Sequence, residues 1–315
     1  MRVREEEKVE NRLKEFLYME WLRMEKVVWN TRASILIGEE LLLGNRILEV
    51  GVGNGYFTFM TLGGRFKPEY DWYYNVNTEG FWKGKDIYDV VKDDVKISYY
   101  VNSTPDKKIV LAIDIKETLL KQAYQLGFIE EVKKADANNP LDFQDKKIDL
   151  VYSNILYWLK DPIGVLNNWE QNLVGKGKIV IVFPNKKFLE FCRSYKLSKI
   201  SEFWKLINRN RAETLMWVKD LDEFEKEIEK NTNLKIKKYE TYLGKTTLTF
   251  WDVGLRPISP YLIEMANSLS PKKRFEVKVK WCEELFPLVM ELFKIELEET
   301  KGGYGAFNFV VLQKD

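Results

Sequence analysis

The chain has 315 residues, of which 45% are hydrophobic and 14% aromatic, enough apolar material for one large domain with a substantial core. It carries 50 Lys and Arg against 48 Asp and Glu, so a surface built uniformly for a polyanion is not indicated, although a local basic patch is compatible with these totals. Histidine is absent, and Cys192 and Cys282 lie far apart, which excludes zinc fingers, His-dependent metal sites and Ser-His-Asp or Cys-His catalysis.

The sequence also bears on where the protein works. No apolar run approaches the roughly 18 residues that a membrane-spanning helix requires. The first residues, 1–8, are charged and lack an apolar secretion segment, and two scattered cysteines are typical of a reducing compartment. These features predict a cytoplasmic protein without a membrane span and without a metal site.

The N-terminal part of the chain has the pattern of helices followed by a strand. Apolar residues in the stretch 8–43 recur mainly at spacings of three and four, so we expect residues 1–43 to form a helical cap. A short apolar strand at 46–50 then enters a glycine-rich turn and a helical stretch at 56–62. Strand, glycine turn and helix in this order open a βαβ unit.

Residues 63–107 interrupt this rhythm, because they are rich in glycine, proline and aromatic side chains. A structureless loop of such length is uncommon inside a compact domain. We therefore interpret the segment as an insertion of short elements.

Strands and helices alternate again after the insertion. The expected strands are 108–114, 129–134, 147–153 and 178–183. A helix is expected at 117–126, and another begins at Asp161-Pro162, an N-cap residue followed by proline at the first helical position. Near-continuous Ile, Val and Leu strands separated by helices predict a parallel sheet covered on both faces. Residues 44–62 and 108–185 are accordingly assigned to the core.

The remaining third of the chain is expected to complete the sheet and to add helices. Residues 186–217 read as a locally basic helical insertion, and 218–244 as an acid-rich helix followed by an alternating strand. Residues 245–303 read as a second insertion, mostly helical after Pro260, and 304–315 as the last strand.

The turn after the first strand, Glu49-Val-Gly-Val-Gly-Asn-Gly55, is the clearest candidate for a ligand site. Glycine lets the backbone approach a ligand closely, and the amides at the start of the following helix favour an anionic group. Nucleotide, phosphate and flavin sites use such loops as well. The spacing Gly51-x-Gly53-x-Gly55 differs from the dinucleotide pattern Gly-x-Gly-x-x-Gly, which disfavours a nicotinamide dehydrogenase.

The pattern Glu-x-Gly-x-Gly-x-Gly resembles the first motif of the class I S-adenosylmethionine-dependent methyltransferases. Other segments resemble later motifs of that family, in the same order along the chain. They are Ile113-Asp114-Ile115, Ala135-Asp136-Ala137, Pro140-Leu-Asp-Phe143, Asp149-Leu-Val-Tyr-Ser-Asn154 and Leu173-Val-Gly-Lys-Gly177. The resemblance implies an α/β, Rossmann-like doubly wound fold: a mostly parallel seven-stranded sheet with an antiparallel last strand, capped by the helical and aromatic insertions.

The resemblance also implies S-adenosyl-L-methionine as the cofactor and indicates which residues contact it. These residues are Glu49, Gly51, Gly53, Gly55, Asp114, Ile115, Asp136, Ala137 and Asn154. In the family, the acid and glycines of the first motif hold the amino-acid part, and the acid after the second strand accepts bonds from the ribose hydroxyls. The third motif binds adenine, and the fourth lies beside the reacting methyl. Structural alternatives are a helix N-cap for Asp114, a turn for Asp136 and a strand-end cap for Asn154.

Methyl transfer from a sulfonium is an in-line displacement, for which a protein mainly aligns the reactants and excludes water. Without histidine, a general base would have to be Asp, Glu, Tyr or Lys, and the sequence singles out none, so no catalytic residue is assigned. The Asn/Asp-Pro-Pro-Tyr motif of amino-group DNA and protein enzymes is absent, as is the Pro-Cys nucleophile of cytosine-5 enzymes. The stretch 152–158 followed by Asp161-Pro162 looks most like the small-molecule branch of the family.

Three side chains are candidates for contacts with the acceptor: Tyr157, Trp158 and Arg256. Tyr157 and Trp158 follow the fourth core strand, on the side where open α/β sheets bind ligands; packing between insertion and core is the alternative. The stretch 251–260 predicts a rigid turn with a fixed Asp–Arg ion pair, although Arg256 is also suited to a carboxylate or phosphate. The basic segment 186–216 is either a solvated helix face or a surface that steers an anionic acceptor.

The leading hypothesis is a methyltransferase for a small or saccharide-like, possibly anionic, molecule. The alternatives are a methyltransferase acting on RNA or protein, which the near-neutral charge mildly disfavours, and a non-catalytic S-adenosylmethionine-binding protein.

Overall fold

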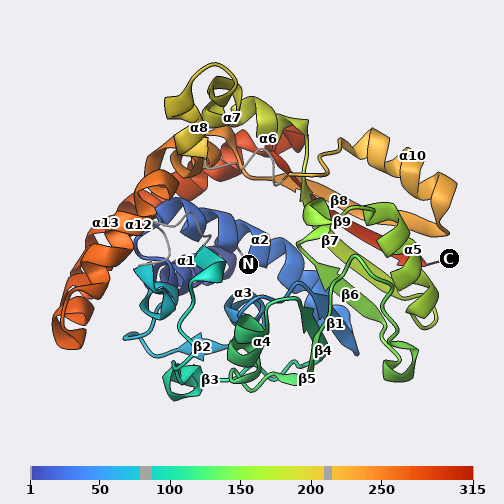
Figure 1. Ribbon diagram of the computed structural model, residues 1–315, viewed down its shortest axis with the longest axis horizontal. Coiled ribbons are helices and arrows are strands. Elements are labelled where there is room, and N and C mark those ends of the chain that lie inside the picture. Colours follow the sequence, from blue (N-terminus) through green and yellow to red (C-terminus); the bar gives the residue numbers. More distant parts are fainter. Residues whose placement is uncertain (1, 79–86, 209–214, 315) are drawn as a thin grey trace.

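The computed structural model describes residues 2–78, 87–208 and 215–314, which are built around one seven-stranded sheet (Figure 1). The strands are β1 (Ile47–Val50), β4 (Ile109–Asp114), β5 (Ile129–Lys134), β6 (Leu150–Ser153), β7 (Lys178–Pro184), β8 (Leu234–Tyr242) and β9 (Phe307–Lys314). Their order is β5-β4-β1-β6-β7-β9-β8; β9 is antiparallel to both neighbours and the other pairs are parallel. The predicted Rossmann-like, mostly parallel sheet with an antiparallel last strand is confirmed.

Helices cover both faces of this sheet because the chain winds outward from its centre in two directions. From β1 it moves to β4 and β5, and from β6 it moves the other way to β7. Since parallel crossovers are right-handed, the two directions place their helices on opposite faces. The first direction uses α3 (Tyr56–Thr61) and α4 (Glu117–Tyr124), and the second uses α5 (Pro162–Asn172), which packs against α10 (Leu221–Asn231).

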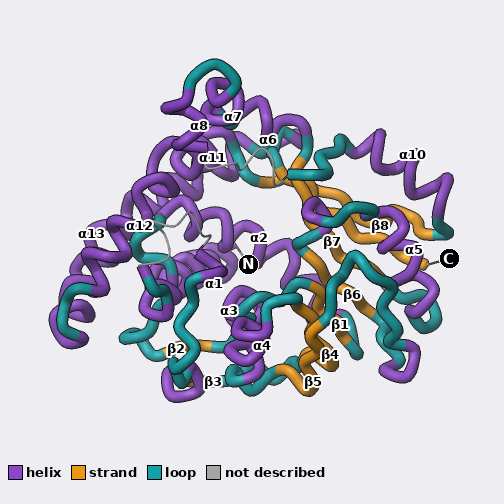
Figure 2. The backbone as a smooth tube through the Cα atoms, viewed as in Figure 1, coloured by secondary structure: helices purple, strands orange, loops and turns teal. Residues whose placement is uncertain are grey.

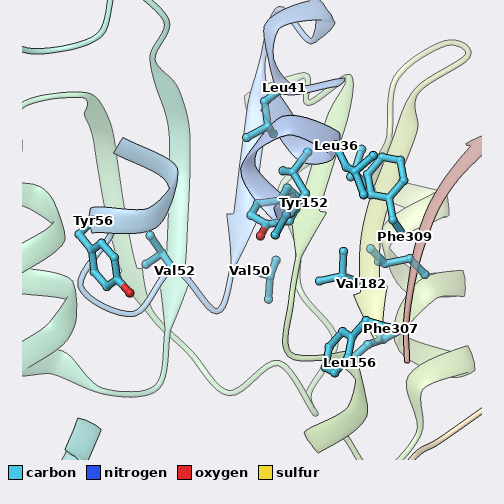
Figure 3. Packing of buried hydrophobic residues seen from close by; sticks show 14 of the residues in the cluster. Leu36, Leu41, Val50, Val52, Tyr56, Tyr152, Leu156, Val182, Phe307 and Phe309 are labelled. Carbon is cyan, nitrogen blue, oxygen red and sulfur yellow. The ribbon is translucent and has the colours of Figure 1, made fainter. Parts of the chain in front are cut away.

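The core lies between the sheet and α2 (Met24–Leu43). Figure 3 shows buried side chains of β1, β6, β7 and β9 packed together with Leu36 and Leu41 of α2. Ion pairs join the C-terminal end of α2 to β7 and β8: Lys178 Nζ lies 3.2 Å from Glu40, and Lys238 Nζ lies 2.8 Å from Glu39. α2 therefore forms part of the layer that covers the sheet.

The predicted helical stretch at 8–43 is two helices, because residues 20–23 separate α1 (Arg2–Met19) from α2. Both pack against α13 (Pro271–Glu299), and α11 (Lys245–Thr249) packs on α2 and α13. Figure 2 shows the helices α1, α12 and α13 gathered on one side of the molecule, apart from the strands. Among the described residues, no helix combines the length and the apolarity that crossing a bilayer requires.

Within residues 63–107 the structure shows only short elements. They are β2 (Arg65–Phe66), β3 (Val101–Ser103), η1 (Trp72–Asn75), η3 (Ile87–Asp89) and η4 (Ile97–Tyr100), and β2 pairs antiparallel with β3. Residues 79–86 of this segment, and 209–214 of the predicted basic segment, lie outside the described residues.

The expected basic segment contains α6 (Lys186–Phe191), α7 (Arg193–Ser198) and α8 (Glu202–Asn208). Its positive charge is partly paired with α10, because Lys186 Nζ lies 2.6 Å from Glu223 and 3.4 Å from Asp220. Such exposed pairs reduce the net field that the segment presents to an approaching anion.

The prediction of a rigid turn at 251–260 is wrong, because helix already runs through the residues before Pro260. A π-helix, η7 (Phe250–Leu255), leads directly into α12 (Arg256–Asn267). Pro257 lacks an amide donor, and the carbonyl of Asp252 instead accepts from the Arg256 guanidinium at 3.3 Å. At Pro260 the hydroxyl of Ser259 donates to the carbonyl of Arg256 at 2.8 Å, replacing the amide that proline lacks. The expected ion pair is present, with Arg256 and Asp252 3.7 Å apart.

Candidate functional site

Three neighbouring strands end at one edge of the sheet and bring the predicted motifs together. In the sheet register Val50 pairs with Ile113 on β4 and with Ser153 on β6. The next residues along these strands are Gly51, Asp114 and Asn154, so the three motifs start side by side. The strand order reverses between β1 and β6, and ligands of open α/β sheets bind at such a reversal.

The glycine loop is shaped by two different requirements. Gly51 has φ +83°, and a Cβ there would lie 2.4 Å from Ile155 Cγ2, so the position is closed to any side chain. Gly53 also has a positive φ, +58°, but a Cβ there would meet no atom within 4 Å. Open space therefore lies over Gly53, where the backbone faces the edge of the sheet.

Glu49 lies beneath this loop, on β1, with a side chain that is almost completely buried. Its Oε1 accepts a hydrogen bond from Thr58 Oγ1 at 2.6 Å, whereas Oε2 is buried and has no partner among the described residues. Burial, opposed by the Thr58 bond and reinforced by the charge of Asp114, raises the pKa of Glu49 to about 8. An unsatisfied buried carboxyl oxygen of this kind is costly unless a donor reaches it.

Asp114 ties the end of β4 to the glycine loop. Its Oδ2 accepts from the amide of Gly53 at 2.8 Å, and its Oδ1 accepts from the amide of Lys116 at 2.9 Å. The N-cap position of α4 is Lys116, so the alternative of a helix N-cap at Asp114 is not realised. A carboxylate has about four acceptor positions, so two bonds leave capacity for further donors. Ile115, the next residue, is 57% exposed although it is apolar.

Asp136 and Ala137 follow β5, the strand beside β4. The Asp136 carboxylate accepts from the backbone amide and the side-chain amide of Asn138, both at 2.9 Å, and these bonds lower the pKa of Asp136. This is the turn geometry given above as the alternative for Asp136. Ala137 is buried beside it.

Asn154 is half-buried at the end of β6. The neighbouring Ser153 ties this end to β1, because its hydroxyl donates to the carbonyl of Val50 at 2.9 Å. The alternative role considered for Asn154 was to cap the end of the strand. Ser153 makes that contact instead.

A buried polar cluster beside the glycine loop was not predicted from the sequence. Glu20, in the break between α1 and α2, accepts from the hydroxyls of Tyr56 and Tyr73 and pairs with Lys26 Nζ at 2.6 Å. Burial, followed by the nearby Glu20 carboxylate, raises the pKa of both tyrosines well above the usual range, so both remain donors. Tyr56 directly follows Gly55, which is the one local feature that places this cluster at the loop. The cluster joins α1, α2 and residues 63–107 at the site.

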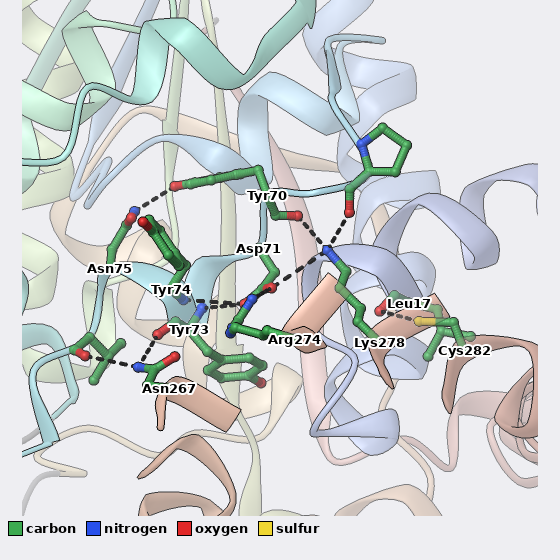
Figure 4. A network of polar contacts seen from close by, with 12 residues as sticks. Leu17, Tyr70, Asp71, Tyr73, Tyr74, Asn75, Asn267, Arg274, Lys278 and Cys282 are labelled. Atoms are coloured by element: carbon green, nitrogen blue, oxygen red, sulfur yellow. Dashed lines mark hydrogen bonds and ion pairs between the residues drawn. The ribbon is translucent and has the colours of Figure 1, made fainter. Parts of the chain in front are cut away.

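The C-terminal helices hold residues 68–76 in place, and with them Tyr73 (Figure 4). Asp71 receives two bonds from the Arg274 guanidinium, at 2.6 and 2.8 Å. Lys278 Nζ donates to the carbonyls of Pro68 and Tyr70 at 2.7 and 2.6 Å. Burial alone would raise the pKa of Asp71, but Lys278 and Arg274 together hold it below the ordinary value. Segments about 200 residues apart in the chain are thus joined by a buried ionic network.

The three acceptor candidates do not lie together. Tyr157 and Trp158 form the short turn η6 (Leu156–Trp158) directly after β6, and the Tyr157 ring lies 5.9 Å from that of Phe307. Trp158 is the more accessible of the two, at 37% exposed. Arg256 instead donates to the carbonyls of α8, at residues 207 and 208, and stacks over Trp251 at 4.7 Å. In this structure the Arg256 guanidinium takes part in the packing of the helical cap, and its contact with an acceptor stays a prediction.

Phe307 is the centre of an aromatic cluster that fills this end of the sheet. Four rings lie within 6 Å of it, and they come from α2, η6, α6 and β8; they are Trp29, Tyr157, Phe188 and Tyr242. Phe307 begins β9, beside the ends of β7 and β8. The cluster closes the edge on the side away from Asp114.

A family model described as a methyltransferase domain matches residues 96–181, the stretch that contains Asp114, Asp136 and Asn154. It falls on β4 to β7, whose order and register bring the motifs to one edge. The chain therefore carries a methyltransferase domain, and its motifs are consistent with the class I S-adenosylmethionine-dependent methyltransferases. The remaining motif, the glycine loop after β1, lies before the matched stretch.

Solved structures resemble this methyltransferase only remotely. The plantazolicin methyltransferase BpumL, in complex with a triazolic desmethylPZN analog and SAH, is 16% identical with a TM-score of 0.44, over 91% of this chain and 85% of that chain. A possible histamine N-methyltransferase from Thermotoga maritima is 15% identical with a TM-score of 0.39, over 86% and 83%. The cyclase SpnF is 11% identical with a TM-score of 0.44, over 90% and 80%. Among curated proteins, none matches the sequence. Likenesses this remote do not indicate an acceptor.

Proposed function

We propose that this methyltransferase moves the methyl group of S-adenosylmethionine to a small-molecule or saccharide-like acceptor. The observation that carries the proposal is that two clusters of side chains, drawn from distant parts of the chain, flank the sheet edge on either side. The Glu20 cluster closes one side of the glycine loop, and the Phe307 cluster closes the far side of β6. An edge enclosed from both sides suits a compact acceptor better than a long polymer.

The described residues fit the cofactor at its amino-acid end. Glu49 Oε2 is buried without a donor, and an ammonium group supplies one. The space over Gly53 accepts the chain of the ligand against the backbone. We assign Glu49 and the glycine loop to the ammonium and carboxylate end of the ligand.

The same edge offers groups for the rest of the cofactor. Asp114 has acceptor capacity for a ribose diol, and the exposed Ile115 beside it offers an apolar surface for the adenine. We keep Asp136 and Ala137 as the adenine-binding pair and Asn154 as the polar group nearest the transferred methyl. When bound, S-adenosylmethionine supplies an electrophilic methyl group; the protein's contribution is to align it with the acceptor and to exclude water.

The two loop glycines provide a test that separates ligand binding from folding. Gly53→Ala should lose about 1 kcal/mol of stability, because alanine is strained at a φ of +58°, but it should still fold and bind S-adenosylhomocysteine at least about tenfold more weakly, because its methyl occupies the open space over the loop. Gly51→Ala should lower the melting temperature much further, because its Cβ also collides with Ile155. Calorimetric titration and thermal unfolding measure the two effects. Unchanged affinity in Gly53→Ala would contradict the assignment of the loop.

Trp158 is expected to contact the acceptor and not the cofactor. A panel of saccharides, phenols and amines assayed with labelled S-adenosylmethionine identifies an acceptor. For that acceptor, Trp158→Ala should raise KM about tenfold, the loss expected for one stacking aromatic ring, while KM for S-adenosylmethionine stays within about twofold. Equal changes in both constants would remove Trp158 from the acceptor site. Transfer to RNA or protein but to no small molecule would overturn the proposed substrate class.

A further inference from the structure

The outer face of α13 carries a straight line of apolar side chains. Trp281, Leu288 and Ile295 are 43%, 50% and 42% exposed, and each follows the previous one by seven residues. Seven residues make nearly two helical turns, so these side chains lie in one row. Half-buried Leu285 falls four residues after Trp281 and three before Leu288, the spacing of a seam along which helices pair.

The fold of the single chain uses this row only in part: the Trp281 ring makes an edge contact with Trp21, with 6.4 Å between the ring centroids, but Trp281 and Leu288 keep about half of their surface exposed. α13 packs on α1 and α2 through other positions, which are Arg274, Lys278, Cys282, Val289, Leu292, Phe293 and Glu296. Figure 1 shows α13 along the outer edge of the molecule. Large apolar side chains that repeat in register on an exposed helix are typical of an interaction surface.

Charges beside the row are divided between the two halves of the helix. On the solvent side of the row, the first half carries Lys273 and Lys280, and the second half carries Glu284, Glu291 and Glu298. Lys273 and Glu291 pair with Glu276 and Lys294 on α13, and Glu298 pairs with Lys301 of the following η8 (Lys301–Gly303). These pairs are exposed and contribute little stability. A parallel partner helix would set like charges against each other, whereas an antiparallel copy sets lysines against glutamates.

We propose that α13 is a self-association surface on which a second copy of the chain packs antiparallel around a two-fold axis. One register places Lys273 opposite Glu298 and Lys280 opposite Glu291. In the same register Trp281 faces Leu288 of the second copy and Val277 faces Ile295, each pair being displaced along the helix by no more than about half a turn. Because the axis is two-fold, every contact occurs twice, which is the closed geometry of a homodimer.

The dimer is expected to be reversible, because one pair of helices buries less surface than a permanent interface. Interfaces below about 1,200 Å² are typical of transient complexes, so dissociation should fall in the micromolar range. The inference concerns assembly and does not depend on the acceptor or the cofactor.

Sedimentation velocity from about 1 to about 200 µM protein tests the proposal. The wild type should shift from monomer to dimer across this range. Leu288→Glu should remain monomeric throughout, with unchanged melting temperature and unchanged affinity for S-adenosylhomocysteine, because the side chain is outside the core. Leu42→Glu alters a leucine of similar exposure, 58%, on α2 and should still dimerise.

Charge reversal distinguishes the antiparallel register from other contacts. Lys280→Glu and Glu291→Lys should each weaken the dimer, and the double variant should restore it, since the two positions then exchange signs. A wild type that stays monomeric at about 200 µM, or a Leu288→Glu variant that still dimerises, would overturn the proposal. So would a monomer that binds phosphatidylcholine–phosphatidylglycerol vesicles through Leu288, because the row would then face a lipid surface.

Discussion

Binding of S-adenosylhomocysteine at pH 7 should release about 0.9 proton from this protein, because the pKa of Glu49 is about 8 and the carboxyl must ionise to receive the ligand's ammonium group. At pH 7 the solution is about one unit below the pKa of Glu49, so the carboxyl of the ligand-free protein is mostly neutral. Its burial makes the neutral form the stable one until a cation arrives. Proton release is measured by titration calorimetry in buffers of different ionisation enthalpy.

The direction of the pH dependence follows from the raised pKa. Below pH 8 the free carboxyl holds a proton that the complex gives up, so affinity should rise about tenfold per pH unit and level off above about pH 8. Glu49→Gln keeps the shape of the side chain but cannot ionise, and it should show weaker binding without pH dependence or proton release. Asp114→Ala should bind more weakly yet retain most of the release, because burial, the largest cause of the raised pKa of Glu49, remains while the smaller contribution of the Asp114 charge is lost. A wild type that binds without releasing a proton would show that Glu49 does not receive the ammonium.

Asp71→Ala should lower the free energy of unfolding by about 3–5 kcal/mol, the usual result of removing one partner from a buried ionic network. The variant leaves the positive charges of Arg274 and Lys278 without their carboxylate partner, and because these side chains are only 4% and 0% exposed, water cannot replace it. The burial of Lys278 is especially costly, because desolvation lowers the pKa of Lys278 and the charge of Asp71 is the largest influence that opposes this shift. Urea unfolding monitored by tryptophan fluorescence measures the loss.

A matched control separates this effect from general charge removal. Lys121→Ala breaks an exposed pair with Glu117 on α4 and should change the free energy of unfolding by less than about 0.5 kcal/mol. If Asp71→Ala were equally mild, the network in Figure 4 would not hold residues 68–76 on α13. Because Tyr73 reaches Glu20 from this segment, the destabilised variant should also bind S-adenosylhomocysteine less tightly.

Much of the core was predictable because its determinants are local. A run of Ile, Val and Leu predicts a buried strand wherever it occurs, and the glycines at 51, 53 and 55 mark the turn after β1 by their backbone freedom alone. Parallel strands end at one edge, so the residues that follow them, such as Asp114 and Asn154, could be placed together without coordinates.

The stretch 251–260 shows where local rules failed. Two prolines and a glycine predict a turn, yet the segment is helical, because Ser259 supplies the donor that Pro260 lacks and packing against α7 and α2 favours the helix. The partners of Arg256 lie on α8, far away in the sequence, so neighbouring residues could not predict them either.

By itself, then, the sequence determined the seven-stranded sheet, the position of its glycine loop and the edge at which the motifs meet. Only the tertiary structure decided what surrounds that edge. Glu20 meets Tyr56 and Tyr73 across 36 and 53 residues, and Asp71 meets Arg274 across 203. Such contacts depend on how whole segments pack and on which buried charges find partners, and no periodicity along the chain records either.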